Sequence, residues 1–181
     1  NFYRWLFAGI ILLPFTLKEI IQKKNYIFSN IGFFIILGIT SITIFNSIVY
    51  YSLYYTQVIS GVLMISTIPV WIIFISSILN IEKTNVFQII GVILSFLGVI
   101  IIITKANFEI LKNLNFNKGD ITMVIAMLSW ALYSTLLKRQ KYEISQLSLL
   151  QVVMSFGLVF LIPVYFIEYQ LGFRITLDKP F

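Results

Sequence analysis

Residues 31–53 read IGFFIILGITSITIFNSIVYYSL, a run whose polar side chains are the amide of Asn46 and a set of hydroxyl groups. The run contains no charged residue. An α-helix rises about 1.5 Å per residue, so a run of this length crosses the roughly 30 Å hydrocarbon core of a bilayer. It therefore predicts a transmembrane helix.

The composition of the whole chain agrees with this interpretation. Of 181 residues, 59% are hydrophobic and 11% are charged, whereas soluble domains are close to half apolar and about a quarter charged. The apolar residues fall in long runs separated by short charged or Asn-rich pieces, which is the pattern that bilayer thickness imposes. We expect an all-α integral membrane protein with about six transmembrane helices.

The approximate limits of the six apolar runs are 2–17, 31–53, 58–79, 86–103, 121–137 and 147–167. The uncharged link between the second and third runs predicts a tight antiparallel hairpin with aromatic residues at the membrane interface. Pro69 removes one helical amide inside the third run and predicts a kink. The hydroxyls of Ser66 and Thr67 are close enough to bond the backbone groups that the kink exposes.

Capping signals stand at the starts of two later runs. Asn85 followed three residues later by Gln88 resembles a capping box. Asp120 suits an N-cap, because its carboxylate meets the free amides and the positive end of the helix. Between these two starts, apolar residues recur at helical spacing within 105–118 and predict a short helix on the membrane surface.

The chain has 13 Lys and Arg residues against 7 Asp and Glu, a formal net charge of +6. Because the basic residues flank apolar runs, where headgroups and the positive-inside bias place them, the charge argues against nucleic-acid binding. The compact basic clusters adjoin the ends of the first and fifth runs, which predicts that 18–30 is cytoplasmic. We expect a multi-pass protein of the cell membrane, which is the inner membrane in a Gram-negative source.

The sequence contains no Cys and no His. Disulfide bonds, thiol chemistry, imidazole catalysis and the usual zinc sites are therefore excluded within this chain. Lipid-modifying membrane enzymes usually need paired carboxylates, a metal site or a His base, and the sequence offers none of these. We expect no enzyme activity, no cofactor and no metal.

A set of motifs carries a resemblance to a known family. Residues 50–56 read YYSLYYT after Phe45-Asn46, residues 128–134 read LSWALYS after Gly119-Asp120, and between them stand Pro69, Glu82, Gln88, Gly91, Gly98 and Val99. In this order and spacing the motifs resemble those of the drug/metabolite transporter superfamily, specifically its EamA-like members. Ser52 is a small departure, because the family often has Ala there.

The resemblance implies two inverted five-helix repeats, of which this chain would hold helices two to seven of ten. Residues 1–104 would form four helices of a partial first repeat, 105–118 an extracytoplasmic loop, and 119–181 two helices of a partial second repeat. We therefore expect a fragment of a carrier that moves a small metabolite or drug-like molecule by alternating access.

Two helical faces offer candidate substrate contacts. Asn46 and Tyr50 lie four residues apart on one face of the second run, and both can form hydrogen bonds in an apolar segment. The alternative is that Asn46 bonds a neighbouring helix while Tyr50 joins an interfacial aromatic belt. Trp130, Tyr133 and Ser134 offer an aromatic and polar face to a flat or amphipathic ligand, with ordinary aromatic packing as the alternative.

Three further features have structural and functional interpretations. Arg4 is the one basic residue within an apolar run, near its end, where it can anchor in the headgroups; the resemblance adds a substrate-binding role. Gly91 and Gly98, with Ser95 between them, form a small-residue stripe that favours close helix packing. Glu82 is expected to organise a cytoplasmic turn.

Other function classes stay open beside the transporter. One is a non-transporting remnant or membrane scaffold, and a less favoured one is a membrane-embedded lipid-modifying enzyme. The expected partners are the lipid bilayer and a small-molecule substrate, without nucleic acid, and a homodimer is left open. Because no Asp, Glu or Lys lies deep within a run, the sequence favours a facilitated or weakly coupled carrier.

Overall fold

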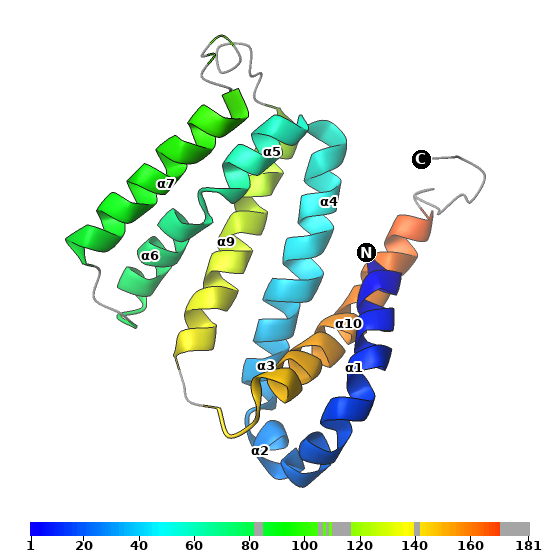
Figure 1. Ribbon diagram of the computed structural model, residues 1–181. Coiled ribbons are helices and arrows are strands. Elements are labelled where there is room, and N and C mark those ends of the chain that lie inside the picture. The colour runs from blue at the N-terminus through cyan, green and yellow to red at the C-terminus, as the bar shows by residue number, and fades with distance from the viewer. Residues whose placement is uncertain (82–84, 105–106, 108, 110–116, 140–141, 171–181) are drawn as a thin grey trace. The chain divides into compact units, whose positions relative to one another are not determined.

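The computed structural model describes residues 1–81, 85–104, 107, 109, 117–139 and 142–170, and within these ranges the regular structure is helical throughout. The elements in Figure 1 are α1 (Phe2–Gln22), α2 (Lys24–Ser29), α3 (Ile31–Gly38), the π-helical segment η1 (Ile39–Ile44), α4 (Phe45–Tyr55), α5 (Val58–Ile65), α6 (Ile68–Ile78), α7 (Val86–Thr104), α9 (Lys118–Lys138) and α10 (Gln146–Gln170).

The helices correspond to the apolar runs. Within the described ranges, five helices are long and apolar enough to cross a membrane, namely Phe2–Gln22, Ile31–Tyr55, Val58–Ile78, Lys118–Lys138 and Gln146–Gln170. The fourth run is α7, whose apolar part Val86–Ile102 is shorter. The prediction of an all-α integral membrane protein is confirmed, while the inverted repeats and their boundaries stay predictions.

The chain forms two compact units, each of which is described by itself. The first unit comprises Asn1–Thr43 and Glu143–Phe181, and the second comprises Ile44–Tyr142. The first therefore contains α1, α2, α3 and α10, and the second contains α4, α5, α6, α7 and α9.

In the first unit, α10 packs against α1 and α3. Gly38 and Gly157 allow the contact with α3 and η1. A Cβ on Gly38 would lie 2.7 Å from the backbone nitrogen of Gly157, and a Cβ on Gly157 would lie 2.4 Å from Cβ of Ile42. At the same crossing, the hydroxyl of Thr43 donates a 3.0 Å hydrogen bond to the carbonyl of Gly157. Small residues let membrane helices approach closely, and here they do so at the π-helical turns of η1.

In the second unit, α9 lies between α4 and α6 (Figure 1). Its core consists of the fully buried Met123, Ala126 and Met127, with apolar side chains of α4, α5 and α6 packed against them. The tight link predicted between the second and third runs is confirmed, since α4 ends at Tyr55 and α5 begins at Val58.

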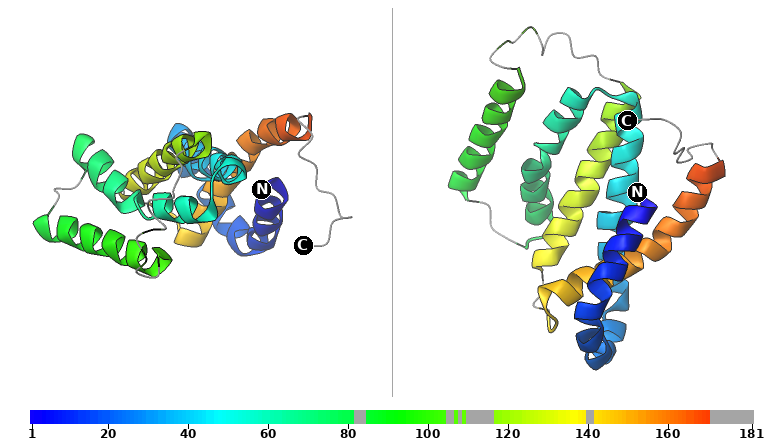
Figure 2. Two further views of the ribbon diagram at one scale, coloured as in Figure 1. Left: turned by 90° about the horizontal axis from the view of Figure 1, so that it is seen from above. Right: turned by 45° about the vertical axis from the view of Figure 1, so that its right-hand side comes forward.

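The edge of the second unit is α7, as Figure 2 shows. Many of its apolar side chains are exposed, for example Phe87 at 80%. A Cβ added at Gly91 or Gly98 would meet open space. The predicted close packing of this small-residue stripe is therefore wrong for the described residues, because no neighbouring helix approaches either glycine.

The start of α9 corrects one prediction. Asp120 is not the N-cap, because the helix already begins at Lys118 and Asn117 caps it. The Asn117 side chain accepts hydrogen bonds from the amides of Gly119 and Asp120, while Asp120 Oδ2 accepts a 2.8 Å bond from the Asn117 amide. Asn caps as well as Asp does, and the reciprocal box bonds amide groups at both positions.

The other capping box is confirmed at the start of α7. The amide of Asn85 donates a 3.0 Å hydrogen bond to Gln88 Oε1, and the amide of Phe87 donates a 3.1 Å bond to Asn85 Oδ1. The predicted surface helix with Phe108, Leu111 and Leu114, and the turn residue Glu82, lie outside the described residues.

The third run breaks as predicted, between α5 and α6, with Pro69 in the first turn of α6. The Ser66 and Thr67 hydroxyls each donate a 2.6 Å hydrogen bond, to the carbonyls of Leu63 and Met64 respectively. The Trp71 indole then donates a 3.1 Å bond to the Thr67 hydroxyl. Side chains thus satisfy backbone groups that the break exposes within an apolar span.

Candidate functional site

The pairing of α4 with α9 positions the predicted substrate contacts. At one end of the pair the backbones almost touch, since a Cβ on Gly119 would lie 2.6 Å from the carbonyl oxygen of Ser52. The hydroxyls of Ser52 and Thr122 are hydrogen-bonded at 2.7 Å, and the Thr56 hydroxyl donates to Asp120 Oδ1. These links hold the two helices in one register.

Farther along the same pair, three aromatic rings form a cluster. The ring centroids of Phe45 and Trp130 are 4.5 Å apart, and those of Trp130 and Tyr133 are 5.2 Å apart. Trp130 and Tyr133 were predicted as contacts, whereas Phe45 was not. Its signal was its position directly before Asn46, but only the packing against α9 brings its ring to Trp130.

Asn46 follows Phe45 and is 8% exposed, so its amide is buried within an apolar span. One residue turns an α-helix by about 100°, so Asn46 lies on the face of α4 next to the one that carries Phe45. A buried amide in a membrane helix is costly unless it bonds another helix or lines a polar path.

Tyr50 lies one turn after Asn46 and is 46% exposed. Near it, Tyr55 contacts Tyr51 and Tyr54 with ring centroids 5.0 Å apart in both pairs. Exposed tyrosines at the end of a membrane span are typical of an interfacial belt. The structure thus separates Asn46, which is buried, from Tyr50, which fits the belt alternative.

The last two predicted contacts lie in different places. Ser134 is half-buried on α9, one turn after Trp130. Arg4 is exposed on α1 in the first unit, and its guanidinium carbon lies 5.1 Å from the ring centroid of Trp5. Such a cation–π contact suits the anchoring interpretation of Arg4.

Chemically, the α4–α9 face combines stacking surfaces with amide, phenol and hydroxyl groups. It can stack a flat molecule and form hydrogen bonds with it. In the described part of the chain, no group of three or more His, Cys, Asp or Glu side chains is placed to hold a metal ion.

Comparison with known proteins gives a consistent result. A model described as the EamA-like transporter family matches residues 1–104. The chain is 30% identical over 159 residues to "Uncharacterized transporter YyaM" of Bacillus subtilis (strain 168), covering 88% of this chain and 52% of that protein.

Two other relatives are named "Uncharacterized transporter". The one from Archaeoglobus fulgidus is 25% identical over 164 residues, with 90% of this chain and 55% of the relative covered. The one from Clostridium kluyveri is 26% identical over 140 residues, with 75% and 44% covered. The chain spans about half the length of these curated relatives. No solved structure matches it significantly.

Proposed function

The chain belongs to the EamA-like transporter family, and from this premise we propose that it forms part of a carrier for a small metabolite or drug-like molecule. The family and the names of the relatives indicate a transporter rather than an enzyme. The apolar spans make it a multi-pass membrane protein, and the proposed location is the cell membrane.

The observation that carries the proposed substrate site is the aromatic cluster of Phe45, Trp130 and Tyr133 beside the buried amide of Asn46. Substrate pockets are mostly apolar and aromatic, with a few polar groups that orient the ligand. Buried polar groups in membrane spans often mark a substrate path. The proposed site is therefore the α4–α9 face, with Ser134 at its edge.

The proposed mechanism is alternating access, in which two inverted repeats rock around a site near the bilayer midplane. Two features support it. The family match ends at residue 104, where we place the end of the first repeat. The third span is broken at Ser66–Thr67, and broken helices are typical of the substrate regions of carriers.

The test is transport by the full-length protein reconstituted in liposomes. A panel of labelled amino acids, nucleosides and drug-like molecules first identifies a transported compound. Asn46→Ala and Trp130→Ala are then expected to lower its rate by about tenfold, the effect of losing one buried hydrogen bond or stacking partner.

Two controls keep the test specific. Phe87→Ala removes an aromatic ring that is 80% exposed on α7 and is expected to leave transport unchanged. Trp130→Phe keeps an aromatic ring in the cluster and so separates a folding defect from a binding defect. Parental rates in both Asn46→Ala and Trp130→Ala would remove the site assignment.

A further inference from the structure

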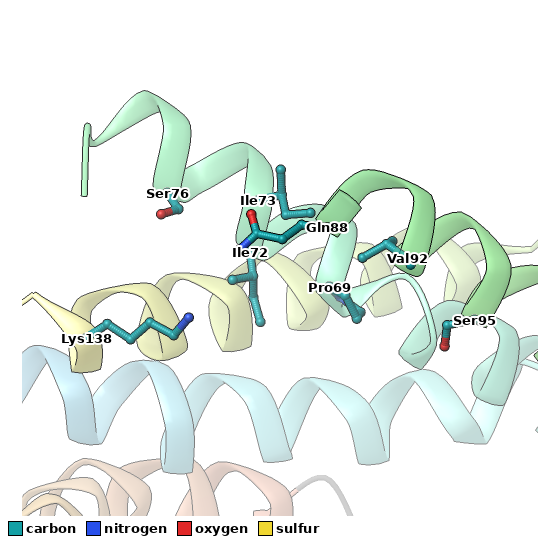
Figure 3. Close-up of a pocket in the computed structure, with 9 residues that line it drawn as sticks. Pro69, Ile72, Ile73, Ser76, Gln88, Val92, Ser95 and Lys138 are labelled. Atoms are coloured by element: carbon teal, nitrogen blue, oxygen red, sulfur yellow. The ribbon is translucent and has the colours of Figure 1, made fainter. Parts of the chain in front are cut away.

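A cavity of about 400 Å³ lies between α6, α7 and α9 in the second unit (Figure 3). Its lining combines the apolar Ile72, Ile73 and Val92 with the polar Ser76, Gln88 and Lys138. None of the predicted substrate contacts lines it. Its volume is within the range of small-molecule sites, which is roughly 300–1,000 Å³.

The polar side chains come from the helix ends that meet on one side of the unit. Ser76 is in the last turn of α6, Gln88 is in the first turn of α7, and Lys138 is the last residue of α9. Because Val58–Ile78 and α9 are long enough to cross the apolar layer, the last turns of α6 and α9 lie at the depth of the lipid headgroups. The cavity is thus polar at its headgroup end, and its lining farther along α6 and α7 is apolar apart from Ser95.

Ser76 supplies an unused hydrogen-bonding group. The residue is 5% exposed, and its hydroxyl has no hydrogen-bond partner among the described residues. Most buried hydroxyls are bonded, and an orphaned one calls for an explanation. An acceptor atom bound in the cavity would supply the missing partner.

The electrostatics of this end favour an anion. Lys138 is the one charged side chain among the described residues of the lining. The start of α7 adds the positive end of a 19-residue helix. Gln88 uses its carbonyl oxygen to cap Asn85, so its amide hydrogens are available to a ligand.

Space for a hydrocarbon chain comes from Gly91, which lines the cavity and whose absent side chain leaves open space. We propose that the cavity binds a phosphate group carried on an alkyl chain. The phosphate meets Lys138, Ser76 and Gln88, and the first carbons of the chain lie along Ile72, Ile73 and Val92. Anionic phospholipids and water-soluble alkyl phosphates share this chemistry. The proposal is independent of the α4–α9 substrate site.

The experiment compares two probes on the full-length purified protein. Binding of phosphatidylglycerol, with phosphatidylcholine as the neutral reference, is measured by native mass spectrometry. Binding of hexyl phosphate is measured by equilibrium dialysis. The test variants are Lys138→Gln, which removes the charge, and Gly91→Leu, which fills the cavity.

Each test variant has a matched control. Arg139→Gln removes the next cation along the chain, which does not line the cavity. Gly98→Leu adds the same side chain on α7, at a glycine that also faces open space but does not line the cavity. Lys138→Gln is expected to bind about tenfold more weakly, as the loss of a charge-assisted hydrogen bond implies. Gly91→Leu is expected to weaken binding because its side chain occupies the space for the alkyl chain, and both controls are expected to bind normally.

The outcomes separate the two ligand sources. If the test variants weaken phosphatidylglycerol binding selectively, the site takes its ligand from the bilayer. If they weaken only hexyl phosphate binding, the site takes a soluble ligand. The proposal is overturned if neither probe responds, or if the control variants lower binding as much as the test variants do.

Discussion

Thr56 donates a hydrogen bond from its hydroxyl to Oδ1 of Asp120, across 64 positions of sequence. The two residues are 8% and 2% exposed. The other carboxylate oxygen of Asp120 closes the capping box of α9. One buried carboxylate therefore both caps α9 and ties it to the end of α4, the pair that carries the proposed substrate site.

Replacing Thr56 with Val should destabilise the protein. The change leaves a buried carboxylate oxygen without its donor, which costs about 1–3 kcal/mol. The measurement is equilibrium unfolding in mixed detergent micelles. Thr56→Ser keeps the hydroxyl and should stay close to the parent; a Thr56→Val protein as stable as the parent would contradict the role given to this bond.

Gly157→Ala should also be destabilising. The new methyl group would lie 2.4 Å from Cβ of Ile42 and 2.9 Å from the carbonyl oxygen of Gly38. The helices must separate, at a cost of about 1–3 kcal/mol for overpacking. Thermal unfolding in detergent measures the loss.

The matched control is Gly98→Ala. A methyl group there meets open space, and Ala favours the helix over Gly by about 1 kcal/mol. We expect an unchanged or slightly higher unfolding temperature. Equal losses in both alanine variants would show that the α3–α10 crossing does not depend on Gly157.

Glu19→Ala should weaken the α1–α10 contact more than Glu143→Ala does. Glu19 accepts hydrogen bonds from the Ser145 amide at 2.7 Å and from the Ser145 and Ser148 hydroxyls at 2.5 Å. Glu143 pairs with Lys23 at 3.6 Å, and the two side chains are exposed, at 63% and 45% respectively. Exposed ion pairs contribute little.

Hydrogen exchange at the start of α10 measures the difference. In Glu19→Ala, amides in the first turn of α10 should exchange faster, because Glu19 holds the Ser145 hydroxyl that accepts a hydrogen bond from the Ser148 amide. In Glu143→Ala, exchange should stay near the parental rate. If Glu143→Ala had the larger effect, the ion pair rather than the hydrogen bonds of Glu19 would hold this end of α10.

Thr67→Val tests the break in the third span. The Thr67 hydroxyl donates to the Met64 carbonyl and accepts from the Trp71 indole. Losing both bonds should cost about 1–3 kcal/mol. Chemical unfolding provides the measurement, and Thr67→Ser, which keeps both bonds, provides the comparison. Equal stability of the two variants would mean that the hydroxyl does not support the break.

Local features were predicted well. The break at Pro69 and the capping box at Asn85 depend on residues within a few positions of each other, so the sequence contains all that forms them. Asp120 was placed in the wrong role because Asn117, three residues earlier, is an equally good cap. Which of the two residues caps α9 depends on the residue at which the helix begins beside α4.

The candidate site was predicted only in part. Trp130, Tyr133 and Asn46 could be chosen because polar and aromatic side chains are rare within apolar spans. Phe45 was not chosen, because its position before Asn46 does not show that its ring meets Trp130; only the packing of α9 decides that. The sequence likewise did not predict that Ser76, Gln88 and Lys138 line one cavity, because they lie on three different helices.

The sequence alone determined that this protein lies in a bilayer and which residues form its helices. Both follow from the length of each apolar run compared with the thickness of a bilayer, and that length is a local property of the sequence. It also carried the family resemblance. The tertiary structure decided that Asn46 is buried while Tyr50 is exposed, that Phe45 meets Trp130, and that α7 leaves a cavity beside α6. These outcomes depend on side chains from distant segments meeting in space. The residue pattern of one helix does not determine which other helix packs against it.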